Sequence, residues 1–157
     1  MLIGFLTVTT CIISLSAATF QTNLSKQLVG EWRNVYMNII MHSYNNTNQT
    51  QIMEADSTNW EQRLQIKPIR TYFKSDGTYY SEYRDLTDKV ERKVSGKWNI
   101  TRADTLVMMQ LDPEKVTLKL HLSIDNDHAT FRGLIDFDGD GKRDDEYYGI
   151  QKKYSVN

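Results

Sequence analysis

The chain of 157 residues has a single cysteine, and this scarcity excludes most thiol chemistry. Cys11 lies in an uncharged, mostly apolar stretch, residues 1–18, which has the composition of a secretory signal peptide and ends in small residues. Cleavage after Ala18 would leave residues 19–157 without any cysteine, so the core must hold the fold without disulfides. We therefore expect an exported protein: periplasmic, on the cell surface or secreted. Lipid attachment at Cys11 is the alternative, which Thr10 disfavours because a small residue is usual there.

An excess of charge is also missing. Lysine and arginine number 19 against 20 aspartates and glutamates, and the formal net charge is −1. No dense stripe of basic residues occurs, which argues against a nucleic-acid partner. The longest apolar run, in residues 1–18, is too short and too rich in threonine to span a bilayer, so we expect no membrane span.

The residue sets that carry catalysis are likewise absent. The three histidines, His42, His121 and His128, lie far apart, and no metal-ligand spacing links them. No motif assembles a Ser/His/Asp or Cys/His set, and no carboxylate pair stands out except within one acidic loop. We therefore do not expect an enzyme.

That acidic loop is the most informative stretch of the chain. Residues 135–146 hold six acidic residues against two basic ones, although the whole chain is close to neutral. Carboxylates occupy the first, third, fifth and ninth positions of a calcium-type loop, with a glycine at the sharp turn and a backbone carbonyl at the seventh position. The predicted ligands are Asp136, Asp138, Asp140, the carbonyl of Lys142, and Asp144, with Gly141 as the turn residue. Calcium is the expected ion, in a structural role.

The loop differs from an EF-hand in its last position and in its flanks. Tyr147 stands where an EF-hand has a bidentate glutamate, and residues 129–137 and 147–154 alternate as strands do. The pattern resembles the Asp-x-Asp-x-Asp-Gly-x-x-Asp loops of extracellular β-hairpins, such as those of integrin propeller repeats, in which the ion is structural. A solvated acidic turn is the alternative, because turns also favour Asp and Gly.

The rest of the chain after the leader predicts one strand after another. In residues 30–42, Val35 falls on one face with Met37, Ile39 and Met41, and Asn34 on the other. Tyr44 to Gln51 is expected to be a loop, and one helix is an open alternative within residues 45–63. Further strands are predicted at 60–73, 78–80, 94–101, 104–111, 116–124, 129–137 and 147–154, with Asp76-Gly77 and Asn126-Asp127 as hairpin turns.

About eight sequential strands joined by hairpins must hide both their edges and their apolar face. An antiparallel up-and-down β-barrel does both, so we predict an all-β fold of this kind. A two-sheet sandwich competes with it, but the short links at Asp76-Gly77 and Asn126-Asp127 favour the barrel.

The segment Gly30-Glu31-Trp32 resembles the Gly-x-Trp that opens the first strand of lipocalins. In that family the indole closes the narrow end of the barrel beneath a basic side chain of the last strand, a place that Lys152 or Lys153 would fill. Tyr72 to Tyr79 and Gly96-Lys97-Trp98 also resemble segments of short exported bacterial lipocalin-like proteins. The resemblance implies structural roles for Gly30 and Trp32. The family's Thr-Asp-Tyr motif is missing, and its usual disulfide cannot form.

The resemblance implies a protein that binds a small apolar or amphipathic molecule, with a calcium hairpin at the rim of the barrel. The side chains proposed to line a pocket are Met37, Ile39, Met41 and Met109. Met53 and Met108 could also line it, and the alternative for all these methionines is that they fill gaps in the core. The alternative is a non-enzymatic surface interaction module with a solid core, stabilised by the same calcium loop. The two differ in what fills the barrel, and an apolar cavity of roughly 300 Å³ or more would favour the first.

Overall fold

The computed structural model describes residues 23–102 and 104–154, which form one antiparallel sheet with short helical pieces. The expected leader, residues 1–18, and Cys11 lie outside this part of the chain. Residues 23–28 are helical. The strands are β1 (Gly30–Met41), β2 (Gln51–Asp56), β3 (Arg70–Phe73), β4 (Thr78–Arg84), β5 (Val90–Arg102), β6 (Thr105–Asp112), β7 (Val116–Asp125), β8 (His128–Ile135) and β9 (Asp145–Tyr154). The short helices are η1 (Tyr44–Asn46) and α2 (Trp60–Leu64).

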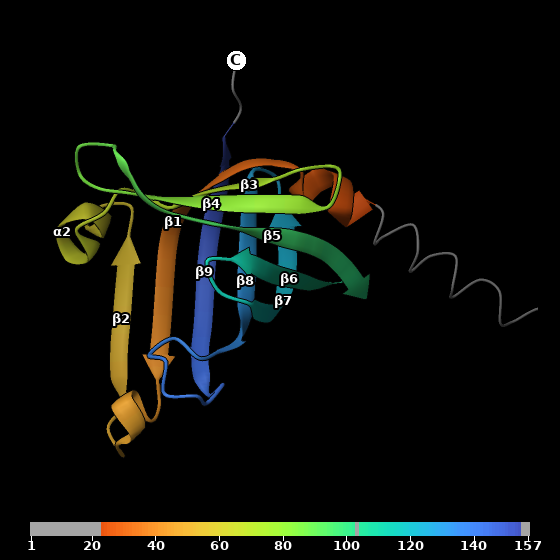
Figure 1. The fold of residues 1–157 in the computed structure, drawn as a ribbon. Coiled ribbons are helices and arrows are strands. Elements are labelled where there is room, and N and C mark those ends of the chain that lie inside the picture. Colours follow the sequence, from red (N-terminus) through yellow and green to blue (C-terminus); the bar gives the residue numbers. More distant parts are fainter. Residues whose placement is uncertain (1–22, 103, 155–157) are drawn as a thin grey trace, which may run out of the picture.

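Strand β1 closes the sheet into a barrel (Figure 1). One edge of β1 pairs with β9 along most of its length, while the other pairs first with β3 and then with β2. From β3 to β9 each strand pairs with the next along the chain, so eight strands close the barrel and β2 extends the sheet beside β1. The predicted all-β, up-and-down architecture is thus confirmed.

The predicted turn at Asp76-Gly77 joins β3 to β4. Oδ1 of Asp76 accepts hydrogen bonds from the backbone N–H of Thr78 at 2.9 Å and from its hydroxyl at 2.7 Å. Gly77 has φ of +81°, which a side chain would disfavour. The predicted turn at Asn126-Asp127 likewise lies between β7 and β8.

Trp32 belongs to the apolar core of the barrel and is fully buried, as predicted. Its indole N–H donates to the carbonyl of Leu28 at 2.6 Å, which ties β1 to the preceding helical segment. The ammonium of Lys153 lies 5.2 Å from the centre of the indole ring, so Lys153 and not Lys152 is the cation on Trp32. Gly30 makes room for it, because a Cβ there would lie 3.0 Å from the Lys153 side chain.

A β-bulge in β1 corrects the predicted faces of this strand. The pairing of β1 with β9 shifts register between Asn34 and Tyr36, so the intervening Val35 is an extra residue. Before the bulge, Trp32 and Asn34 are buried, and after it Met37 and Ile39 are buried. Asn34 therefore faces the interior, and its predicted place on the outer face with polar residues is wrong.

The region between β1 and β3 differs most from expectation. Residues 51–56 form the added strand β2, although Gln51 was predicted to end a loop. The strand predicted over residues 60–73 is confirmed only at β3, because residues 60–64 form α2. Trp60 packs there into a second apolar cluster, separate from the core around Trp32, with Met37, Ile39, Met41 and Ala55. Burial of residues 60–64 against β1 and β2 therefore decides that they form a helix.

Candidate functional site

The barrel encloses a cavity of about 360 Å³ that is partly open to solvent. Most of its lining is apolar, and it is contributed by every strand of the barrel together with β2 and α2. Its lining includes Asn34, Met37, Ile39, Thr71, Tyr79, Ser81, Tyr83, Val94, Met108, Gln110, Phe137, Tyr147 and Gln151. A concave apolar space with a few polar groups is the usual form of a small-molecule site.

Two of the four predicted pocket residues line the cavity, and two do not. Met37 and Ile39 line the cavity. Met41 is buried in the second apolar cluster and does not line the cavity, because α2 and β2 enclose it. Met109 is 46% exposed, so its place in the pocket was wrong. Its neighbour Met108 lines the cavity instead, as strand alternation allows only one of two successive side chains to point inward.

Four buried polar side chains form one wall of the cavity. Nε2 of Gln151 on β9 donates to Oδ1 of Asn34 on β1 at 3.3 Å. Next to β1, the hydroxyls of Thr71 on β3 and Ser81 on β4 lie 2.9 Å apart. No local sequence pattern indicates this wall, because Asn34 faces inward only through the bulge at Val35.

Three tyrosines add hydroxyl groups to the cavity. Burial raises the pKa of Tyr79 to about 12, with a smaller contribution from Tyr83. Burial also raises the pKa of Tyr147 to about 12, although a hydrogen bond from Asn34 opposes the rise. The pKa of Tyr83 is raised by burial as well. These phenols therefore stay protonated and uncharged at neutral pH.

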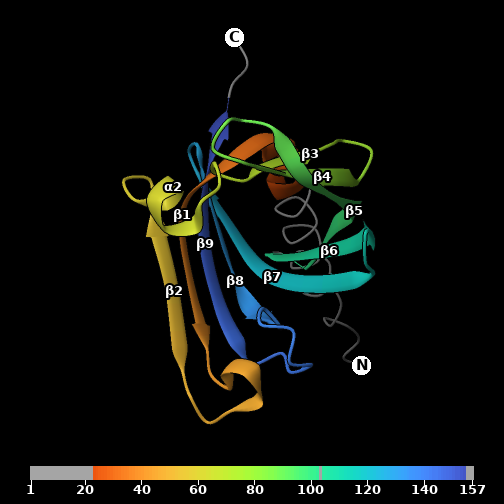
Figure 2. The same ribbon diagram turned by 60° about the vertical axis from the view of Figure 1, so that its left-hand side comes forward.

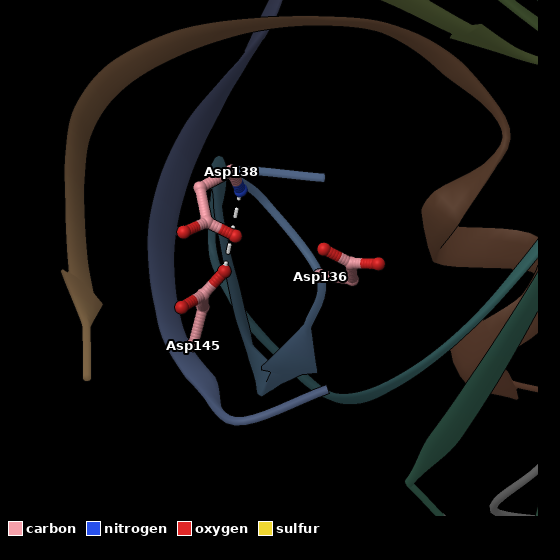
Figure 3. A group of neighbouring side chains, drawn as sticks. All are labelled: Asp136, Asp138 and Asp145. Carbon is pink, nitrogen blue, oxygen red and sulfur yellow. Dashed lines mark hydrogen bonds between the residues drawn. The ribbon is translucent and has the colours of Figure 1, made fainter. Parts of the chain in front are cut away.

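The acidic hairpin between β8 and β9 brings three carboxylates together (Figure 3). One oxygen each of Asp136, Asp138 and Asp145 lies within 4.8 Å of the others, a grouping that could hold a metal ion. Asp145, which is 1% exposed, accepts hydrogen bonds from the backbone N–H groups of Phe137 at 2.6 Å and Asp138 at 3.4 Å. The predicted ligand set did not include Asp145, because this residue is the first of β9 and does not fall on a ligand position of the loop pattern.

Two other predicted ligands, Asp140 and Asp144, lie outside this group of three. The hydroxyl of Ser43 lies 3.0 Å from Oδ2 of each, and its single proton is shared between the two carboxylates. The backbone N–H of Lys142 and the Ser43 hydroxyl hold the pKa of Asp140 below its usual value. Lys142 also places its ammonium 3.5 Å from Asp140, and Gly141 has the positive φ of +88° expected at the turn.

The hairpin is fastened to the connection that follows β1, and both lie at the same end of the molecule (Figure 2). Besides Ser43, the backbone N–H of Asn45 donates to Asp138 at 2.7 Å. His42 lies 2.7 Å from Glu146 across the same junction. Phe137, between Asp136 and Asp138 in sequence, lines the cavity while remaining 44% exposed, which places it at the rim. The acidic loop and the cavity therefore share one segment of chain.

Comparison with known proteins does not assign the chain to a protein family. No protein family model matches the sequence, and no curated protein matches it either. The closed barrel is consistent with the lipocalin-like fold that Gly30 and Trp32 suggested. In the part of the chain that the structure describes, no helix has the length and apolar character needed to cross a membrane.

Proposed function

We propose that this protein is a lipocalin-like binding protein that holds one small apolar or amphipathic molecule inside its barrel. The observation that carries the proposal is the cavity of about 360 Å³, lined mainly by apolar side chains. Filling such a space with an apolar molecule removes the surfaces of both from water, at about 25 cal/mol for each Å² buried. Its volume falls in the range of known ligand sites, roughly 300 to 1,000 Å³.

The same observation favours this function over a surface interaction module with a solid core. A barrel that only displays its outer face gains nothing from an internal space, because unfilled volume costs stability. Here large side chains such as Trp32 and Trp98 pack at one end, and the cavity lies beyond them, bounded in part by α2 and β2.

We propose further that the protein is exported and acts by binding and not by catalysis. The uncharged apolar residues 1–18 support export, and the absence of cysteine from residues 19–157 suits a chain that needs no disulfide. The lack of a recognisable catalytic motif in the sequence supports a binding role.

Calcium at the acidic hairpin is the second part of the proposal. Asp136, Asp138 and Asp145 supply oxygens of the kind that calcium prefers, and Asp140 and Asp144 bring two more carboxylates into the same loop. Bringing so many carboxylates together without a cation is unfavourable, because like charges repel. We expect the ion to fix the segment that carries Phe137 and so to define the rim of the cavity.

Native mass spectrometry of the protein purified from its own host tests both parts together. The expected spectrum shows the intact chain with one bound small molecule, released by organic solvent, and with bound calcium that chelator removes. A chain that carries neither, and that also fails to take up apolar compounds when they are added, would contradict the proposal. Calcium without any small molecule under both conditions would favour the surface interaction module.

A further inference from the structure

The cavity is polar on one side but uncharged throughout. Its polar lining consists of amides and hydroxyls: Asn34, Thr71, Ser81, Gln110 and Gln151, with Tyr79, Tyr83 and Tyr147. Among the described residues that line it, none is an aspartate, glutamate, lysine, arginine or histidine. A ligand that carries a full charge would thus lose its water without gaining a counter-charge, which is strongly unfavourable.

A chain of hydrogen bonds along β9 and β1 leaves one acceptor free. Asn34 donates to the phenol of Tyr147, and Oδ1 of Asn34 in turn accepts from Nε2 of Gln151 at 3.3 Å. With the amide of Gln151 in this orientation, its Oε1 atom is buried and has no hydrogen-bond partner among the described residues. Gln151 lines the cavity, and the residue is only 8% exposed.

The other two polar side chains of the wall have a partner. The hydroxyls of Thr71 and Ser81 share a hydrogen bond of 2.9 Å. Outside the wall, Nε2 of Gln110 donates to the carbonyl of Glu114 at 3.1 Å. Since buried polar atoms almost always have a partner, Oε1 of Gln151 is the position in the wall where a donor is required.

We infer that the cavity selects an uncharged amphipathic molecule whose hydroxyl group donates a hydrogen bond to Oε1 of Gln151. This inference rests on the proposed binding function and specifies its ligand. The apolar body of the molecule lies against the remaining lining, which includes Met37, Ile39 and Phe137. A carboxylate head is rejected, because at neutral pH it has no proton to donate and would place its charge beside an acceptor.

The tyrosines are consistent with this choice. Their raised pKa values keep Tyr79 and Tyr147 protonated, so they offer hydroxyl groups to the oxygen of an alcohol and no charge to an ion. A single hydroxyl on the ligand can both donate to Gln151 and accept from a neighbouring phenol.

The test compares three ligands with the same ten-carbon chain on the unaltered, intact protein. 1-Decanol has a donor, its methyl ether keeps the oxygen but has no donor, and decanoate carries a negative charge at pH 7.5. Isothermal titration is expected to show decanol binding about tenfold more tightly than the ether, since the ether leaves the buried acceptor unpaired. Decanoate is expected to bind more weakly than either.

Two matched variants locate the head group. Gln151→Leu removes the free acceptor and should reduce the preference for decanol over the ether from about tenfold to about onefold. Gln51→Leu makes the same chemical change at an exposed glutamine of β2 that does not line the cavity, and should leave that preference intact. Circular dichroism and thermal melting confirm that each variant is folded.

The outcomes separate this inference from the proposed function. If none of the three compounds binds, the binding function itself fails and the inference with it. If the ether or decanoate binds as tightly as decanol to the unaltered protein, the cavity binds ligands but the assigned head group is wrong. Equal loss of preference in Gln151→Leu and Gln51→Leu, or an unchanged preference in Gln151→Leu, would also overturn the placement at Gln151.

Discussion

Replacing Asp136 by asparagine should remove much of the stabilisation that calcium gives to this protein, without disturbing the fold in its absence. Asp136 is the most suitable carboxylate for this test, because it is exposed and its Oδ2 accepts a single hydrogen bond from Gly141 at 3.1 Å, which an amide oxygen can replace. Asp138 uses both oxygens, accepting from Asn45 and Asp140, and Asp145 is buried. Changes at Asp138 and Asp145 would therefore damage the apo structure as well.

The magnitude follows from mass action. Calcium at the proposed site would bind the folded state, in which Asp136, Asp138 and Asp145 are assembled, and not the unfolded chain. Free calcium at a hundred times the dissociation constant adds about 2.7 kcal/mol to the free energy of unfolding. For a domain of this size the melting temperature then rises by roughly 5 to 10 °C. Asp136→Asn should weaken calcium binding about tenfold, and the apo variant should be as stable as the original or slightly more so, because one repulsive charge is gone.

The assay is thermal melting by circular dichroism in millimolar calcium, in millimolar magnesium and in excess chelator, with calorimetry for the calcium affinity. Magnesium should stabilise poorly, since it demands octahedral geometry and gives up its waters reluctantly. Asp125→Asn is the matched control, because it changes an exposed aspartate at the turn between β7 and β8, outside the acidic loop. Identical melting curves in calcium and chelator, with no heat of binding, would refute the calcium site and leave an acidic turn.

Three further predictions follow from the buried aromatic residues. Trp32→Ala should lower the free energy of unfolding by about 3 to 5 kcal/mol in urea, and a loss below about 1 kcal/mol would show that Trp32 does not close the barrel. Because the folded-state pKa values of Tyr79 and Tyr147 are raised to about 12, the contribution of these two residues to stability should be fully present below pH 10. It should be lost between pH 10 and 12, where only the unfolded chain loses these protons. Urea unfolding at pH 9 and 11 measures this, and Tyr79→Phe should reduce the fall; an unchanged slope would contradict burial as its cause. Gly149→Ala should weaken ligand binding severalfold by titration, because its Cβ would displace the Tyr147 ring that lines the cavity, and unaltered affinity would mean that the ring does not shape the site.

Much of the barrel can be predicted from local signals. Asp76-Gly77 and Asn126-Asp127 mark the hairpins because few residues suit tight turns, and alternation of apolar residues marks the strands between them. The resemblance to lipocalins predicts that a lysine of the last strand contacts Trp32. The register of β1 against β9 shows that this lysine is Lys153.

The cavity wall could not be predicted, because it depends on tertiary register. A bulge at Val35 moves one residue out of the alternation, so Asn34 turns inward to meet Gln151, a residue 117 positions away in sequence. In contrast, the sequence allows the prediction that Met108 and not Met109 points into the barrel, since Leu106 and Met108 share one face of a strand. Helix α2 depends on burial of Trp60 against β1 and β2, a contact that local sequence does not specify.

In the acidic hairpin, the spacing of aspartates identified the loop but not which carboxylates converge. Asp136 and Asp138 meet Asp145, whereas Ser43 from the distant β1 connection holds Asp140 and Asp144. The pattern of positions in a loop describes an isolated segment, and a partner from elsewhere in the chain changes which oxygens remain available.

The central claim, that the barrel interior is a ligand site, is tested most directly by filling it. Val94→Phe adds a ring to a buried residue that lines the cavity, whereas Leu134→Phe makes a comparable enlargement at an exposed residue on the outside of the barrel. Titration with the uncharged fluorescent probe N-phenyl-1-naphthylamine should give one site in the original protein. The account predicts affinity at least about tenfold weaker in Val94→Phe and unchanged in Leu134→Phe, with both variants folded. Undiminished binding by Val94→Phe would contradict it and place the probe outside the barrel.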